Sequence, residues 1–476
     1  MAQASRYRPM DHLDLRLPQS VPEAYEHQAI ETPQAAAICV PGQLELSYEV
    51  VVERSRLLAS RLSERLPEAS KACSVGLLVD RTHPDFLPLL LACARCLRPF
   101  ILLSTDLPDA ARQDARNRFL VETLKPSLVV ADSAERVAAI PLVEGQDWIS
   151  LEDSLFNIDL LGSLGQSAVD RVKQQPKHDD AECLLSFMCT GGSQRLKIAR
   201  VTHRMMLHEF RFYAEVCGLK VQSEQIDVVG LVPDQLRLLA EDPKTQLPSL
   251  RLVITWAERL PPALADRWRG HPAKLIELLI ATEYWLSFYG LPLQHPKGEE
   301  RTGTPLLPAA SAVKFAILDD SLTPVQVGQV GELYLHGPMV CAGYVDAGDT
   351  EAQFLTLRGR RYFKTMDLVR LLPSGGFVYH SRADRHAKLR GQWVDLAALE
   401  QSLQDTDPSG DLVAFLALSD ACASAGRARE LLPWRAALRL RSGLPRTANG
   451  KLDGQALQEV IAAEKRAQEV SWLFMV

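Results

Sequence analysis

Short apolar runs alternate with helical stretches along much of this chain. An apolar run at residues 74–79 is followed by a helical pattern at 85–96 and by the next apolar run at 100–103. Further candidate strands lie at residues 126–131, 183–188 and 226–231. Short apolar runs that alternate with helices are typical of strands buried on both faces. The sequence therefore predicts an α/β fold with layered, mostly parallel sheets covered by helices.

Two other stretches refine this prediction. An apolar run at residues 35–40 and a short one at 46–49 precede a helical stretch to residue 66, which predicts the first of two strand–helix repeats. Ser47 stands where the cap of that helix belongs, because its hydroxyl can accept a bond from a free N–H of the first turn. After residue 303, short candidate strands and turns replace the alternation of strands and helices. We therefore expect a β-rich subdomain at about residues 303–380.

The composition excludes several classes of protein. The chain has 476 residues, of which 47% are hydrophobic and 24% charged, as in ordinary globular proteins. A net charge of −6 provides no basic surface for nucleic acid, so no nucleic-acid partner is expected. The longest apolar stretch, residues 86–97, is too short to span a membrane and contains Arg95. The N-terminus shows no signal peptide.

The nine cysteines give no framework for disulfides or zinc. The only close pair is Cys93 and Cys96, and no second pair completes a tetrahedral site. A buried pair on one helix is the simpler interpretation. We therefore expect a reducing, cytoplasmic setting.

A short loop after the candidate strand 183–188 has the chemistry of a phosphate site. Thr190, Gly191 and Ser193 supply hydroxyls and unhindered backbone N–H groups, and Lys197 adds a positive charge. The pattern alone is weak, because an ordinary surface turn uses the same residue types. Both interpretations stay open at this point.

Two segments near the C-terminus carry a family resemblance. Residues 381–391 read Ser-Arg-Ala-Asp-Arg-His-Ala-Lys-Leu-Arg-Gly, and residues 444–453 read Leu-Pro-Arg-Thr-Ala-Asn-Gly-Lys-Leu-Asp. Both resemble the closing motifs of adenylate-forming enzymes, which include acyl-CoA synthetases and the adenylation domains of peptide synthetases. The resemblance implies that Lys451 is the adenylation lysine, and that Lys388 turns toward the site when the thioester forms. It also implies a large N-terminal domain, residues 1–383, and a small mobile α+β lobe, residues 384–476.

The same resemblance assigns the remaining site residues. The stretch 189–197 resembles the family's phosphate loop, in which Thr190, Gly191, Ser193 and Lys197 keep the phosphate-binding chemistry. Thr282 resembles the threonine that meets the α-phosphate, and Glu283 the glutamate that helps to hold Mg²⁺. Asp367 resembles the aspartate that binds both ribose hydroxyls, and Arg382 the arginine that contacts ribose and phosphate. A structural salt bridge is the alternative for Asp367 and Arg382.

Several positions depart from the family pattern. Gln194, Ile280 and Met366 stand where the family has glycines, and Leu279 replaces a tyrosine expected against adenine. Trp256 and Ala257 stand where the family has two glycines beside the adenine, and we expect the Trp256 indole to fill part of the adenine slot. A core tryptophan at a strand end is the alternative. The segment that carries the aspartate for a substrate ammonium group has no counterpart.

The resemblance implies ATP- and Mg²⁺-dependent activation of a carboxylic or amino acid to an acyl-adenylate, with release of pyrophosphate. Coenzyme A or a separate carrier protein would accept the acyl group. The alternative is a catalytically inactive relative that acts as a binding or scaffold module. The sequence does not name the acid, the acceptor or the oligomeric state.

Overall fold

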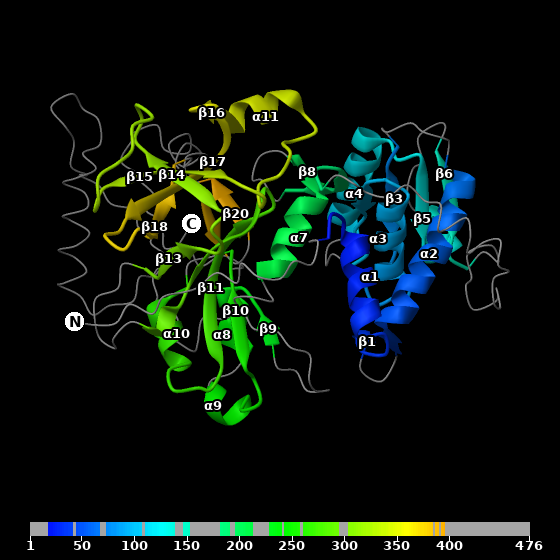
Figure 1. Ribbon diagram of the computed structural model, residues 1–476, viewed down its shortest axis with the longest axis horizontal. Coiled ribbons are helices and arrows are strands. Elements are labelled where there is room, and N and C mark those ends of the chain that lie inside the picture. Colours follow the sequence, from blue (N-terminus) through cyan, green and yellow to red (C-terminus); the bar gives the residue numbers. More distant parts are fainter. Residues whose placement is uncertain are drawn as a thin grey trace, which may run out of the picture.

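The computed structural model describes most of the chain up to residue 395. The described residues are 18–40, 44–66, 73–106, 110–138, 146–152, 181–190, 196–212, 228–239, 242–257, 260–294, 303–383, 386–389 and 392–395. Two main sheets carry these residues, and they lie side by side in Figure 1.

The first main sheet has six strands in the order β6-β5-β3-β4-β7-β8. Its strands are β3 (Val75–Leu78), β4 (Phe100–Leu102), β5 (Leu128–Ala131), β6 (Asp147–Ser150), β7 (Leu184–Cys189) and β8 (Ile198–Thr202). The helices of this half are α1 (Val21–Glu31), α2 (Tyr48–Arg65), α3 (Phe86–Arg95), α4 (Ala110–Leu124), α5 (Ala134–Ala138) and α7 (His203–Phe212). All neighbours pair in parallel except β7 and β8, which form an antiparallel hairpin.

Helices cover both faces of this sheet, as the alternating sequence predicts. Side chains of α1, α2 and α3 form one core with residues such as Leu77 and Val130. On the other face, Leu120 and Val121 of α4 pack against Ile101 and Val129. The strands therefore bury alternate side chains in two separate cores, which is why each strand reads as a continuous apolar run.

The N-terminal strands are a correction to the predicted strand–helix repeat. Strand β1 (Ala36–Val40) pairs with β2 (Leu44–Ser47) in a separate antiparallel hairpin and joins neither main sheet. The cap is confirmed, because the Ser47 hydroxyl accepts a hydrogen bond from the Val50 N–H at 3.4 Å. A run of four or five apolar residues does not encode whether its partner is parallel or antiparallel, since that choice is made by the turn and by packing.

The second main sheet has ten strands. Its central order is β14-β15-β17-β18-β13-β12-β11-β10-β9, and β16 pairs with β17. The strands are β9 (Val228–Gly230), β10 (Leu252–Thr255), β11 (Lys274–Ala281), β12 (Tyr284–Gly290), β13 (Pro305–Pro308), β14 (Lys314–Leu318), β15 (Val330–His336), β16 (Phe354–Leu357), β17 (Arg360–Leu371) and β18 (Phe377–Arg382). The helical segments are α8 (Pro233–Leu239), α9 (Pro243–Gln246), α10 (Pro262–Arg267), the 3₁₀ turn η3 (Pro292–Gln294) and α11 (Ala347–Gln353).

This second sheet is mixed rather than mostly parallel, which corrects that part of the fold prediction. Strands β9, β10 and β11 are parallel, and every pairing from β11 to β14 is antiparallel. The β-rich stretch after residue 303 therefore continues the same sheet. Short hairpin turns permit antiparallel pairing, whereas parallel strands need a crossover such as α8 or α10.

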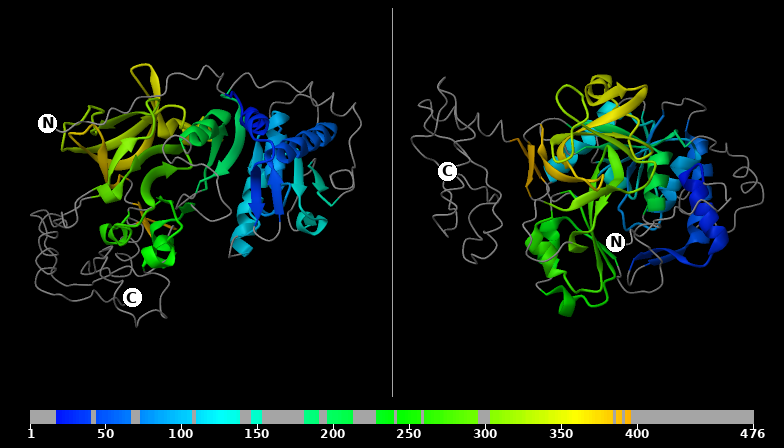
Figure 2. Two further views of the ribbon diagram at one scale, coloured as in Figure 1. Left: turned by 60° about the horizontal axis from the view of Figure 1, so that its bottom comes forward. Right: turned by 60° about the vertical axis from the view of Figure 1, so that its left-hand side comes forward.

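The last described elements form a small sheet of their own. Strands β19 (His386–Leu389) and β20 (Gln392–Asp395) pair with each other in a small antiparallel sheet. Figure 2 shows these strands in orange. Within the described ranges, no helix is long and apolar enough to cross a membrane.

Candidate functional site

Tyr344 brings together two of the predicted site residues. The Lys197 ammonium lies 5.2 Å from the centre of the Tyr344 ring, over its face. The Tyr344 hydroxyl donates a hydrogen bond of 2.7 Å to the carboxylate of Glu283. Lys197 also lies 3.8 Å from the Asp349 carboxylate of α11. One tyrosine thus positions the predicted phosphate-loop lysine and the predicted metal-binding carboxylate at one place.

The environment keeps Tyr344 protonated. Burial of the phenol and then the charge of Glu283 raise the pKa of Tyr344 far above its ordinary value. A protonated phenol donates, so it orients the carboxylate without adding a charge. A signal for Tyr344 existed in the sequence as the Gly-Tyr pair at 343–344, although nothing there indicates which carboxylate the hydroxyl meets.

The predicted phosphate loop lies at the tip of the β7–β8 hairpin. The Thr190 N–H donates to the Lys197 carbonyl at 2.8 Å and closes the neck of the loop. Thr190 itself is buried. Gly191 and Ser193 lie outside the described residues. The structure therefore places the two ends of the loop in contact and leaves the roles of its tip as a prediction.

Thr282 and Glu283 form the two-residue turn between β11 and β12, where Ala281 pairs with Tyr284. A helix start, the ordinary alternative for such a pair, is excluded by this position. The turn is pinned from both sides, because the indole N–H of Trp285 donates to the Thr282 carbonyl and the Cys341 N–H to the Glu283 carbonyl. These two bonds therefore fix the backbone that carries the Glu283 side chain.

Asp367 and Arg382 are in direct contact, on neighbouring strands β17 and β18. The Arg382 guanidinium lies 3.2 Å from one carboxylate oxygen of Asp367 and donates to the Thr365 carbonyl at 3.1 Å. The other carboxylate oxygen accepts a bond of 2.9 Å from the Tyr284 hydroxyl. Only 5% of the Asp367 side chain is exposed. The two residues thus lie at one place, and no pattern in the sequence pointed to Tyr284.

Two positions where the family has glycine keep a glycine-like backbone. Ala257 has φ of 76° and Met366 has φ of 65°, both in the left-handed region. A side chain there costs roughly 1–2 kcal/mol, because its Cβ crowds the backbone. Met366 is also held by the Ala383 N–H, which donates to its carbonyl at 2.8 Å. Both positions therefore hold a backbone conformation that glycine adopts readily, although neither residue is glycine.

Trp256 lies directly after β10, at the strand end. Its indole packs with Ile280 against a cluster that includes Ile254 and Leu278, and it covers Gly230 of β9. Trp256 and Ile280, which both stand where the family has glycine, belong to one apolar cluster. Leu279, which replaces the tyrosine expected against adenine, packs against a different cluster. The position fits a core tryptophan, and occupation of an adenine slot remains a prediction.

Of the two site residues predicted on the C-terminal lobe, one lies among the described residues. Lys388 lies in β19, where its backbone pairs with Trp393. Lys451, the predicted adenylation lysine, lies outside the described residues. Their roles therefore stay predictions, as does the boundary at residue 384.

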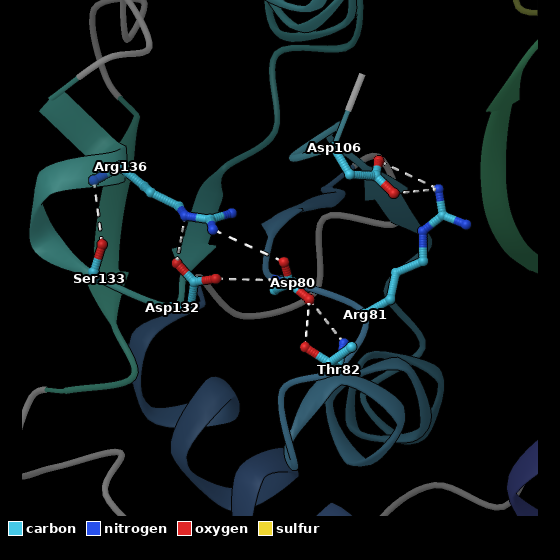
Figure 3. Close-up of polar contacts among 7 residues, drawn as sticks. All are labelled: Asp80, Arg81, Thr82, Asp106, Asp132, Ser133 and Arg136. Carbon is cyan, nitrogen blue, oxygen red and sulfur yellow. Dashed lines mark hydrogen bonds and ion pairs between the residues drawn. The ribbon is translucent and has the colours of Figure 1, made fainter. Parts of the chain in front are cut away.

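A second polar cluster, which the sequence did not reveal, lies at the carboxyl ends of β3 and β5 (Figure 3). The Asp80 N–H donates to the Asp132 carboxylate at 3.0 Å, and Arg136 lies 3.0 Å from Asp132 and 3.9 Å from Asp80. Bonds from the Thr82 hydroxyl and N–H lower the pKa of Asp80. The single guanidinium offsets part of the charge of the two carboxylates, and the cluster joins two strand ends.

Comparison with known proteins identifies the family. A family profile described as AMP-binding enzyme matches residues 204–345, the stretch that contains Glu283 and Tyr344. The fold resembles an artificially fused adenylation–PCP di-domain of NpsA and ThdA from Klebsiella oxytoca, with a TM-score of 0.64 over 82% of this chain and 84% of that one. The chain belongs to the AMP-binding, adenylate-forming superfamily. The identity to this di-domain is 17%, so the likeness concerns the fold.

The relatives of this superfamily member are distant. It is 24% identical to tyrocidine synthase 3 of Brevibacillus parabrevis over 80% of its own length, and it spans 6% of that synthase. It is 26% identical to novobiocin biosynthesis protein H of Streptomyces niveus, of which it spans 71%. Klebsiella oxytoca NpsA in complex with 3-hydroxyanthranilyl-AMSN has a TM-score of 0.61 over 93% of this chain. Adenylation-domain homologues thus cover most of the chain at low identity.

The described residues allow a test of the expected Mg²⁺. They contain no group of three or more His, Cys, Asp or Glu side chains placed to hold a metal ion. Glu283 is a single, oriented carboxylate. Mg²⁺ usually takes one or two protein carboxylates together with phosphate oxygens and water, so Glu283 fits an ion that arrives with a nucleotide.

Proposed function

We propose that this protein activates a carboxylic or amino acid with ATP, forming an acyl-adenylate and releasing pyrophosphate. The observation that supports this most is the meeting of Lys197 and Glu283 at Tyr344. Binding of a nucleoside triphosphate requires a positive charge for the phosphates and a carboxylate for Mg²⁺. Lys197 and Glu283 can supply these two charges from segments far apart in the sequence.

In the proposed reaction, a carboxylate oxygen of the substrate attacks the α-phosphorus of ATP. The bond between the α-phosphorus and the bridging oxygen breaks, and pyrophosphate leaves. Bound Mg²⁺ would offset phosphate charge. Lys451 would stabilise the charge that grows in the transition state, which accelerates the chemical step more than it strengthens binding.

The remaining residues have roles in binding. Thr190, Gly191, Ser193 and Lys197 would hold the phosphates, Thr282 the α-phosphate, Glu283 the Mg²⁺, and Asp367 and Arg382 the ribose. Lys388 would face the site in the second half-reaction. The acyl group would then pass to coenzyme A or to a separate carrier protein.

A second candidate is a catalytically inactive relative that binds a ligand or partner. Two observations favour it. Both carboxylate oxygens of Asp367 already have hydrogen-bond donors, and Trp256 packs with Ile280 where the family keeps glycines. Both observations concern residues expected to bind the nucleoside part of ATP. Neither concerns the residues expected to bind the phosphates.

Pyrophosphate exchange into ATP, measured over a panel of amino acids and carboxylic acids, separates the two candidates. We expect exchange with at least one acid, and an exchange rate lower by orders of magnitude in the Lys451→Ala variant at nearly unchanged ATP affinity. Arg441→Ala, a nearby loss of positive charge, is the matched control and should keep the exchange. Absence of exchange in the parent protein with every acid would favour the inactive relative.

A further inference from the structure

Tyr284 makes a contact at the candidate site that the family resemblance does not account for. It is the first residue of β12, and its phenol is 3% exposed. The hydroxyl donates to Asp367 at 2.9 Å, across 83 residues of sequence. Burial and then the Asp367 charge raise the pKa of Tyr284 well above its ordinary value, so the phenol remains a donor.

We propose that Tyr284 is an internal competitor for the ribose of the nucleotide. Its hydroxyl holds Asp367 in a closed state, and a ribose diol binds that carboxylate only after the phenol has moved away. This inference rests on the proposed function, because it takes Asp367 as the ribose-binding residue.

The chemistry of the two donors supports competition. A carboxylate only accepts hydrogen bonds, and a phenol O–H and a ribose O–H are donors of the same kind. In the closed state one oxygen of Asp367 is bound to Tyr284 and the other to Arg382. With 5% of the side chain exposed, a diol cannot reach either oxygen while both donors stay in place.

The backbone around Tyr284 is irregular. It directly follows the two-residue turn at Thr282–Glu283, and the register of β11 against β12 shifts between Leu279 and Ala281. Such irregular pairing interrupts the ladder and often lies beside active sites. Two residues later, Leu286 has a φ of 33° in the strand. The start of β12 is therefore less regular than its remainder.

The neighbouring residue connects this switch to the phosphate half of the site. Glu283 precedes Tyr284 in the chain and is held by Tyr344, which lies against Lys197. Glu283 and Tyr284, which are consecutive in the chain, thus each take part in a hydrogen bond between a tyrosine and a carboxylate. Release of Tyr284 by a ribose would shift the backbone that carries the predicted Mg²⁺ ligand.

The test compares ATP with 2′,3′-dideoxy-ATP, which lacks both ribose hydroxyls, by calorimetry on the full chain with Mg²⁺. The variant Tyr284→Phe removes the competing hydroxyl and keeps the ring. We expect it to bind ATP about fivefold more tightly than the parent, the equivalent of one net hydrogen bond, and to bind dideoxy-ATP as the parent does.

Tyr334→Phe is the matched control. Tyr334 is equally buried and its hydroxyl donates to Glu332 at 2.9 Å, so the variant loses the same kind of bond without touching Asp367. Its affinities for both nucleotides should equal those of the parent. Thermal unfolding of each variant checks that it folds. If Tyr284→Phe does not fold, Tyr284→Met offers a flexible side chain for the same space and should show the same gain for ATP alone.

The outcomes distinguish the two hypotheses. If the parent prefers ATP to dideoxy-ATP and Tyr284→Phe shows no gain, the competitor is overturned and the proposed function stands. An equal gain in affinity for both nucleotides also overturns the competitor hypothesis, because the gain then does not depend on the ribose hydroxyls. If neither the parent nor any variant binds either nucleotide at millimolar concentration, the proposed function fails and the competitor fails with it.

Discussion

The indole of Trp256 lies so close over Gly230 that a methyl group on Gly230 would stand 2.9 Å from two of its ring carbons. This contact joins the ends of two parallel strands, β9 and β10. We expect Gly230→Ala to lower the free energy of unfolding by about 1–3 kcal/mol, because the indole must shift. In a Trp256→Ala background the same change should be nearly neutral. Urea denaturation of the four proteins measures this coupling, and strictly additive effects would contradict it.

The same indole bears on nucleotide binding. Trp256→Gly should tighten ATP binding in calorimetry if the ring fills part of an adenine slot, although the lost packing lowers stability by about 2 kcal/mol. Trp268→Phe on the far side of the sheet, where Trp268 is fully buried beside α10, is a control for loss of an indole. An affinity that is unchanged or weaker would show that Trp256 serves the core alone.

The strained backbone at Ala257 gives a prediction for stability. Its φ of 76° is one that glycine adopts without cost. We expect Ala257→Gly to raise the free energy of unfolding by about 1 kcal/mol. The control is Ala281→Gly in β11, where φ is not in the left-handed region, and it should lower stability by a similar amount. A loss of stability at both positions would show that the Ala257 methyl group packs usefully.

Glu209 predicts a dependence of stability on pH. It is half-buried on α7 and has no hydrogen-bond or ion-pair partner among the described residues, and burial raises its pKa from 4.5 to about 7. Because the folded state binds the proton more tightly than the unfolded state, the stabilisation is complete below pH 4.5 and is lost as the pH rises through 7. The loss is at most about 3 kcal/mol.

The variant Glu209→Gln removes this titration. We expect it to be more stable than the parent at pH 8 and to lose that advantage at pH 4.5, as measured by chemical denaturation. Glu122→Gln, at an exposed position of α4, controls for the removal of a negative charge. A Glu209→Gln advantage that does not change between the two pH values would contradict the assignment.

Tyr344 and Glu283 should be energetically coupled. Tyr344→Phe keeps the ring under Lys197 but loses the 2.7 Å bond, so it should lower the free energy of unfolding by about 1–2 kcal/mol. In a Glu283→Ala background the same change should cost almost nothing. Tyr334→Phe should cost the same in both backgrounds, because its partner is Glu332. Denaturation curves of the single and double variants decide this.

The local helices and strands could be predicted from the spacing of residues along the chain. The expected strand at 74–79 and the helix at 85–96 appear as β3 and α3 within one or two residues, and Ser47 caps its helix as predicted. These features depend on the spacing of apolar residues and on cap chemistry, which neighbouring residues fix. The family resemblance added the proximity of Asp367 and Arg382, which the structure places 3.2 Å apart.

The pairing of strands and the contacts between distant side chains could not be predicted in this way and depend on the packing of the whole chain. The β1–β2 hairpin, the antiparallel pairing from β11 onward and the Thr282–Glu283 turn depend on register between strands, which apolar runs do not encode. The tyrosines that donate to Asp367 and Glu283 lie 83 and 61 positions away from them in the chain. The sequence around a tyrosine does not indicate which distant carboxylate its hydroxyl will bind, because that partner is determined only when the whole sheet packs.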